Sequence, residues 1–93
     1  MIMKYKVLSV YDAKLQAFGT PRFERMEASA IRAFTDGVNQ EDKANNLYNH
    51  PEDYSLWLLA EFDDEKGEFE TLKPRNILGA ASVHKGFGKL EVK

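Results

Sequence analysis

The side chains best placed to do chemistry are the acids that cluster in the stretch AEFDDEKGEF. Asp63, Glu65 and Gly67 alternate as in a calcium-binding loop, which also needs glycine at its sixth position and glutamate at its twelfth. Counted from Asp63, those two positions hold Glu68 and Pro74. The pattern therefore fails as a calcium site. It predicts instead a solvated hairpin loop in which Gly67 adopts a positive φ.

Other catalytic motifs are incomplete. His50 and Glu52 form the H-x-E half of a zinc deaminase motif, but the chain has no cysteine to supply the second half. The serines lack the glycines of a nucleophile elbow, and the G-x-G fragment at residues 86–88 has Glu91 where a dinucleotide loop needs its third glycine. We therefore predict no enzymatic activity and no bound metal or cofactor.

Charge is distributed unevenly along the chain, although the formal net charge is only −2. Residues 1–25 carry five basic and two acidic groups, residues 26–73 four and twelve, and residues 74–93 four and one. If the two ends of the domain lie close together, as termini often do, a basic surface faces away from an acidic one. The alternative is that the two sets of charges intermingle and cancel.

The basic ends make nucleic-acid binding the leading hypothesis. The cations predicted to contact phosphates are Lys4, Lys6, Arg22, Arg25, Arg75, Lys85 and Lys89. Tyr5, Tyr11, Phe23 and Phe87 are candidates for stacking on unpaired bases. The alternative is that Tyr5 and Tyr11 belong to the core and that the lysines only keep the surface soluble.

The acidic middle segment supports a rival hypothesis, in which the protein docks on a basic partner protein. Asp63, Asp64 and Glu65 are its candidate contacts, with Glu68 and Glu70 beside them. Self-association through an exposed edge strand at residues 68–73 is compatible with either hypothesis.

Apolar periodicity predicts five elements in the order strand, helix, strand, strand, helix. They are expected at residues 3–11, 27–38, 55–62, 68–73 and, beginning at Pro74, a short helix that carries Ile77, Leu78 and Ala81. The second strand is expected to place Leu56, Leu58, Ala60 and Phe62 on one face. The fold class is therefore predicted as α+β, a β-α-β-β-α domain with a three-stranded, mainly antiparallel sheet covered by helices. The helical connection makes the first two strands candidates for parallel neighbours.

Size and composition favour one globular domain. The chain has 93 residues, of which 43% are hydrophobic and 30% charged. We expect the domain to span residues 1–81, with residues 82–93 as either a flexible basic tail or a short extra strand. The absence of cysteine, and of an apolar run long enough for a signal or membrane segment, favours a protein that stays in the cytoplasm.

Four stretches, VYDAKLQAFG, AIRAFTDGVN, HPEDYSLWLLAEFDDEKGEF and KPRNI, resemble the small nonstructural protein of gokushoviruses and related microviruses, which are single-stranded DNA phages. The likeness spans about residues 3–81, whereas residues 82–93 depart from it. It implies a nonstructural accessory protein in the cytoplasm of the infected bacterium, absent from the capsid. It also implies a role in viral DNA synthesis or packaging, through single-stranded DNA or the proteins that handle it. It implies no catalytic residues.

Overall fold

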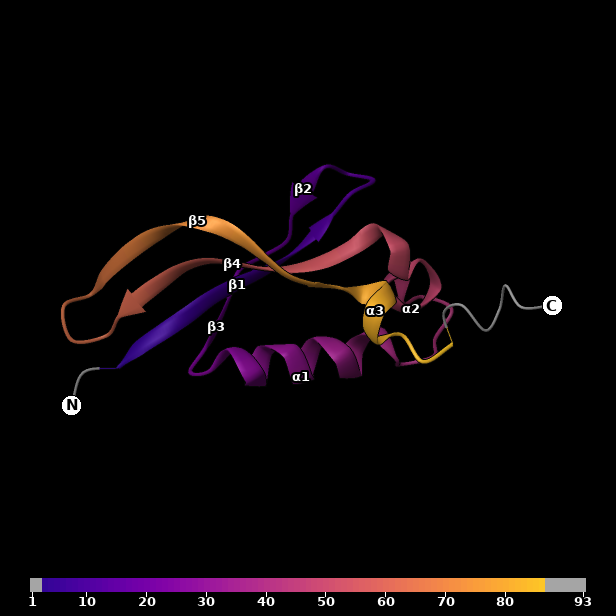
Figure 1. Cartoon of the computed structure of the whole chain (residues 1–93), viewed down its shortest axis with the longest axis horizontal. Coiled ribbons are helices and arrows are strands. Elements are labelled where there is room, and N and C mark those ends of the chain that lie inside the picture. Colours follow the sequence, from indigo (N-terminus) through magenta and orange to yellow (C-terminus); the bar gives the residue numbers. More distant parts are fainter. Residues whose placement is uncertain (1–2, 87–93) are drawn as a thin grey trace.

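The computed structural model describes residues 3–86, and its main feature is a five-stranded antiparallel sheet (Figure 1). Its strands are β1 (Lys4–Asp12), β2 (Ala17–Phe18), β3 (Arg22–Glu24), β4 (Tyr54–Asp63) and β5 (Glu68–Gly79). Strand β1 pairs with β4 on one side; on the other it pairs with β3 near its start and with β2 at its end. Strand β5 pairs with β4 and forms the far edge. The molecule is elongated, with extents of 54 × 25 × 21 Å.

In the described part of the chain four short helical segments accompany the sheet, and the longest confirms the helix predicted at residues 27–38. They are α1 (Glu27–Val38), α2 (Asn46–Asn49), the 3₁₀ helix η1 (Pro51–Asp53) and α3 (Ala80–Val83). Helix α1 forms because Ala30, Phe34 and Val38 recur at helical spacing and are all buried. None of the helices between residues 3 and 86 is long and apolar enough to cross a bilayer.

The predicted three-stranded sheet covered by helices is wrong, because the chain forms two further strands before α1. Strands β2 and β3 both run antiparallel to β1, so the chain reverses direction at the turn between β1 and β2, before the helix begins. Helix α1 therefore connects β3 to β4, with β1 between them, and β4 lies antiparallel to β1 rather than parallel. The result is a mostly β fold with short helices (Figure 1).

The helix predicted to begin at Pro74 is also wrong. Strand β5 continues through Pro74 to Gly79, and helix α3 begins only at Ala80. Proline lacks an N–H group, so within a sheet it is confined to edge strands and bulges, and both conditions hold here. Residues 72–74 lie in an irregularity of the edge strand, where Leu58 pairs with Arg75 but Ala60 pairs with Thr71.

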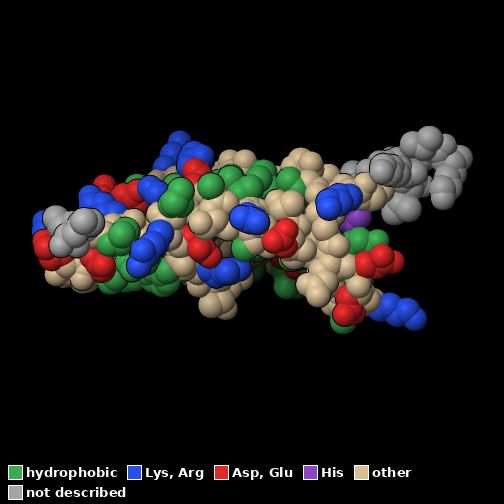
Figure 2. Space-filling model, turned by 90° about the horizontal axis from the view of Figure 1, so that it is seen from below, with side chains coloured by type: hydrophobic (Ala, Val, Ile, Leu, Met, Phe, Trp, Pro, Cys, Tyr) green, Lys and Arg blue, Asp and Glu red, His purple; other side chains and the backbone are tan. Residues whose placement is uncertain are grey.

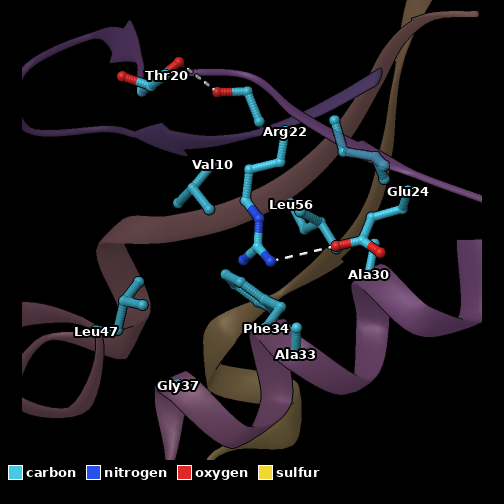
Figure 3. Close-up of a pocket in the computed structure, with 13 residues that line it drawn as sticks. Val10, Thr20, Arg22, Glu24, Ala30, Ala33, Phe34, Gly37, Leu47 and Leu56 are labelled. Atoms are coloured by element: carbon cyan, nitrogen blue, oxygen red, sulfur yellow. Dashed lines mark hydrogen bonds and ion pairs between the residues drawn. The ribbon is translucent and has the colours of Figure 1, made fainter. Parts of the chain in front are cut away.

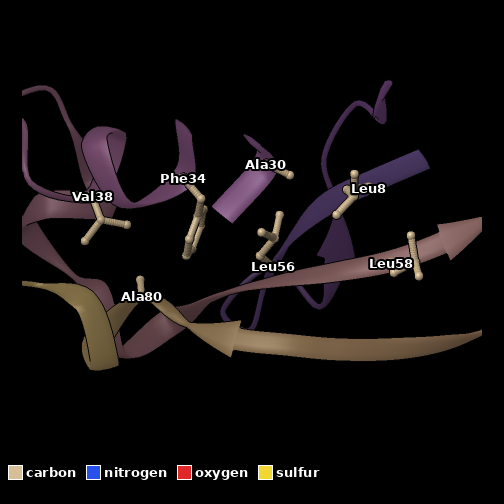
Figure 4. Close-up of a cluster of buried hydrophobic side chains, with 7 residues drawn as sticks. All are labelled: Leu8, Ala30, Phe34, Val38, Leu56, Leu58 and Ala80. Atoms are coloured by element: carbon tan, nitrogen blue, oxygen red, sulfur yellow. The ribbon is translucent and has the colours of Figure 1, made fainter. Parts of the chain in front are cut away.

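The core lies between α1 and one face of the sheet (Figure 4). Its buried members are Leu8, Ala30, Phe34, Val38, Leu56, Leu58 and Ala80. Asn39 fixes the end of α1 against α3, because its side-chain amide donates to the carbonyl oxygens of Thr35 at 2.9 Å and Val83 at 2.8 Å. The start of β1 and the adjoining parts of β4 and β5, with the turn between them, extend beyond the N-terminal end of α1 (Figure 1). We call residues 4–7 and 60–71 the arm.

A bulge in β4 changes which side chains face the helix. Val7 and Leu8 are consecutive in β1, but their partners in β4 are Ala60 and Leu58, so Leu59 is an extra residue. The insertion reverses the alternation, and Phe62 therefore lies on the face of Trp57 and not on that of Leu58. The prediction that Phe62 shares a face with Leu56 and Leu58 is wrong for this reason.

Candidate nucleic-acid interface

The structure pairs three of the seven predicted phosphate contacts with glutamates. The pairs are Lys6 with Glu61 at 2.6 Å, Arg22 with Glu24 at 3.2 Å and Arg75 with Glu27 at 2.7 Å. The hydrogen bond from the Lys6 ammonium is the main cause that lowers the pKa of Glu61 below its usual value, against an opposing effect of burial. Both members of each pair remain partly exposed, so each of these cations has a neighbouring carboxylate but is still accessible to solvent.

The remaining predicted cations are separated along the molecule. Within residues 3–86, Lys4, Arg25 and Lys85 form no ion pair. Lys4 begins β1 in the arm, and Arg25 follows β3, which pairs with β1 near the arm. Lys85 follows α3 at the opposite end (Figure 1), and Lys89 lies outside the described residues. Figure 2 shows basic and acidic side chains interspersed over the face that carries α1, with no basic field on that face.

The predicted acidic contacts lie at the tip of the arm, in the turn between β4 and β5. The Asp63 carboxylate accepts hydrogen bonds from the backbone N–H groups of Glu65 at 2.9 Å and Lys66 at 3.1 Å, and Gly67 has a φ of 67°. The Asp64 carboxylate accepts from the backbone N–H of Met3 at 3.0 Å. Asp63 therefore organises the turn, as expected of a hairpin loop, while Glu65 is exposed.

Two groups of three aromatic rings lie on the sheet. Tyr11, Phe18 and Trp57 form the Trp57 triad, with ring centroids 4.8 to 6.3 Å apart. Tyr11 and Phe18 are cross-strand partners in β1 and β2, and the ring N–H of Trp57 donates to the hydroxyl of Ser55 at 2.8 Å. The rings meet edge to face or tilted, geometries that aromatic pairs prefer.

Phe23 of β3 packs against Phe62 and Phe69 of the arm, and the three rings form the Phe62 triad, with centroids 4.8 to 6.0 Å apart. Strands β3 and β5 are separated by β1 and β4, which on a flat sheet would place their side chains about 14 Å apart. Phe23 and Phe69 are nevertheless 6.0 Å apart, so the sheet curls toward these rings.

Both triads lie on the face opposite α1. Side chains alternate along β1, so Tyr5, Val7, Ser9 and Tyr11 face away from Leu8, which packs in the core beneath α1. The register places Phe18 beside Tyr11, Trp57 beside Ser9, Phe23 beside Val7 and Phe62 beside Tyr5. We call the two triads together the aromatic face.

The rings on the outer strands of the aromatic face are accessible. Phe18 is 42% exposed, Phe23 49% and Phe69 57%. Two of the predicted stacking residues, Tyr11 and Phe23, belong to this face, whereas Phe87 lies outside the described residues. The other four members were not predicted, because their proximity depends on strand register and on the curl of the sheet.

His50, Glu52 and Asp53 form the one group of potential metal ligands found among residues 3–86. One ligand atom from each lies within 4.8 Å of the others, at the start of η1. His50 and Glu52 are exposed, and turns of this kind commonly gather polar side chains in solvent. The geometry therefore gives no reason to assign an ion.

Comparison with known proteins agrees with the resemblance found in the sequence. The sequence model of the Phage ORF5 protein family matches residues 5–83. Protein ORF5 of Chlamydia phage 1, a gokushovirus, is 37% identical over 65 residues, a stretch that covers 66% of each chain. Neither description names an enzymatic activity, and no solved structure matches. The chain is a phage nonstructural protein and belongs to the Phage ORF5 family.

Proposed function

We propose that this protein is a non-enzymatic accessory protein that binds single-stranded viral DNA during its synthesis or packaging, with unpaired bases stacked on the aromatic face. The observation that carries the proposal is the pair of ring triads on the face of an antiparallel sheet opposite α1. β-Sheets that bind single-stranded nucleic acid commonly present aromatic side chains on one face. Membership of a family from single-stranded DNA phages supports the choice of ligand.

Stacking suits this protein better than a purely electrostatic mode of binding. Every base has an apolar face, so stacking contributes about 1 to 3 kcal/mol per base without a fixed sequence. Three of the cations that would contact phosphates in electrostatic binding are already paired with Glu61, Glu24 and Glu27. A protein of net charge −2 then relies on its rings for affinity and on a few unpaired cations for phosphate contact.

Fluorescence polarisation of a labelled oligothymidylate tests the proposal, with the emission of Trp57 as an internal probe. Phe18→Ala and Phe69→Ala should each weaken binding by roughly 5- to 150-fold, the loss expected for one stacked base. Met26→Ala is the matched control, because Met26 is 60% exposed and lies outside both triads. No binding at about 50 mM salt would contradict direct binding of DNA, and equal affinity for all variants would contradict stacking on these rings.

A second candidate function is docking on a basic protein of the replication or packaging machinery, through the acids of the arm. It is favoured by the exposure of Asp64, Glu65, Glu68 and Glu70, none of which forms an ion pair within residues 3–86. Under this hypothesis Glu65→Lys together with Glu68→Lys abolishes cross-linking to phage proteins in infected cells. Glu41→Lys with Glu52→Lys, at exposed positions outside the arm, is the matched control.

A further inference from the structure

An apolar groove lies beside α1, on the side of the sheet opposite the aromatic face (Figure 3). Leu8, Val10 and Leu56 line it from the sheet, Ala33 and Phe34 from α1, and Leu47 from α2. Its volume is about 330 Å³, near the lower end of the range of roughly 300 to 1,000 Å³ found for ligand sites. The groove therefore suits one or two aliphatic side chains better than a whole helix.

The rim of the groove is polar. Arg22 extends from β3 over the groove, and its guanidinium lies 3.2 Å from the Glu24 carboxylate (Figure 3). Ala33 and Gly37 are small, so the wall formed by α1 leaves the apolar floor open. A side chain that enters the groove therefore meets an apolar floor and, at the rim, one carboxylate and one guanidinium.

The turn between β1 and β2 presents an apolar side chain of matching size. Leu15 is 75% exposed, the highest value among the large hydrophobic residues described as exposed. The turn that holds it is well ordered by hydrogen bonds. The Asp12 carboxylate accepts from the backbone N–H groups of Lys14 at 2.9 Å and Leu15 at 3.3 Å, and the Gln16 N–H donates to the Asp12 carbonyl at 2.7 Å.

The base of this turn is fixed to the body of the protein. The backbone N–H of Ala13 donates to the carbonyl of Asp53 in η1 at 2.8 Å, and Gln16 adopts a left-handed φ of 57°. A constrained turn loses little conformational freedom when its tip is buried by a partner. Leu15 is thus held largely in solvent by an organised backbone.

We propose that the groove receives the β1–β2 turn of a second copy of this chain, with Leu15 on the apolar floor. Charge supports this occupant, because a carboxylate accepts from two cations: Lys14, next to Leu15, would share Glu24 at the rim with Arg22, which lies 3.2 Å from it. Size supports it as well, since the groove accommodates a leucine and its neighbour. The groove lies on the sheet face opposite the aromatic rings, whereas the turn that enters it follows Tyr11 and precedes Phe18 of the Trp57 triad.

Sedimentation velocity without DNA tests this contact. The wild-type protein should associate as its concentration rises, and Leu15→Ser should weaken association by roughly 10- to 100-fold, the loss expected for one buried leucine. Ala33→Met should have a similar effect by filling the groove. The matched controls are Met26→Ser, a comparably exposed apolar residue, and Ala28→Met on the exposed side of α1; neither lines the groove.

Mixing the two variants makes the test specific. Leu15→Ser retains an open groove and Ala33→Met retains the leucine, so an equimolar mixture should form heterodimers although each variant alone stays monomeric. A wild-type protein that remains monomeric up to about 1 mM would overturn the proposal. So would unchanged association of Leu15→Ser, whose exposed turn position keeps the fold intact. Binding of a small apolar ligand in the groove without self-association would likewise overturn it.

Discussion

The salt dependence of DNA binding is the sharpest test of stacking against electrostatic binding. For single strands, the logarithm of the affinity falls with the logarithm of the salt concentration with a slope of about −0.7 per phosphate neutralised. Among residues 3–86, Lys4 and Arg25 are the predicted cations that form no ion pair and lie in or near the arm. Two contacts give a slope of about −1.4, so affinity should fall about 7-fold between 50 and 200 mM salt.

If all seven predicted cations contacted phosphates, the salt dependence of the affinity would be much steeper. The slope would be about −4.9, and the same change in salt would reduce affinity roughly 900-fold. Polarisation of a labelled oligonucleotide at several salt concentrations separates these two values easily. A slope steeper than about −3 for the wild-type protein would refute the inference that glutamates occupy part of the cationic set.

Removing those glutamates should change the slope in a known direction. Glu24→Gln, Glu27→Gln and Glu61→Gln together free Arg22, Arg75 and Lys6. With five contacts the slope should steepen to about −3.5, a loss of about 130-fold over the same range of salt. Glu41→Gln, Glu52→Gln and Glu65→Gln together form the matched control, because they change the net charge equally without freeing a cation. Equal steepening in both triple variants would show that overall charge, and not the ion pairs, sets the slope.

Three further predictions concern stability and are checked by urea denaturation. Leu8→Ala should lower the free energy of unfolding by about 2 to 5 kcal/mol, because Leu8 is 1% exposed within the core, and a change below about 1 kcal/mol would contradict this packing. Gly67→Ala should cost about 1 to 2 kcal/mol, because Gly67 has a φ of 67° and open space around it, so only backbone strain opposes the methyl group. The pKa of Glu61 is lowered on folding, so its contribution to stability is present above the unfolded value of 4.5 and is lost as the pH falls through the folded value. Lys6→Met should therefore flatten the acid limb of the stability profile, and an unchanged limb would exclude the Lys6–Glu61 pair as its cause.

The local sequence pattern was sufficient to predict the elements in which apolar or turn-forming residues recur at regular spacing. Helix α1 follows from the spacing of Ala30, Phe34 and Val38, and the turn before Gly67 follows from its acids and its glycine. Strands β2 and β3 were missed because they have two and three residues and flank turn-forming residues that dominate the local pattern. Pro74 was misassigned because proline begins helices more often than it lies in a strand, and only its place at the sheet edge permits the latter.

The candidate site was less predictable than the fold, because it depends on contacts between distant segments. Tyr11 and Phe23 were identifiable as aromatic residues of the basic N-terminal segment, but the sequence does not show which rings join them. Phe62 reaches the aromatic face only because Leu59 is inserted in β4, and a bulge leaves no periodic signal. The pairing of Lys6 with Glu61 likewise depends on register between strands that are 55 residues apart.

The irregular course of β5 has a consequence for the behaviour of the protein in concentrated solution. An incoming strand that paired with this edge would lose its hydrogen-bond register at residues 72–74, where Pro74 offers no N–H group. In a parallel, in-register pairing, a second copy of the same strand would also bring Glu68 and Glu70 next to their own counterparts, and like charges repel. The edge thereby resists the open-ended stacking that produces fibrils. Concentrated samples should accordingly form no amyloid fibrils. Any association seen by sedimentation would then involve a surface other than this edge.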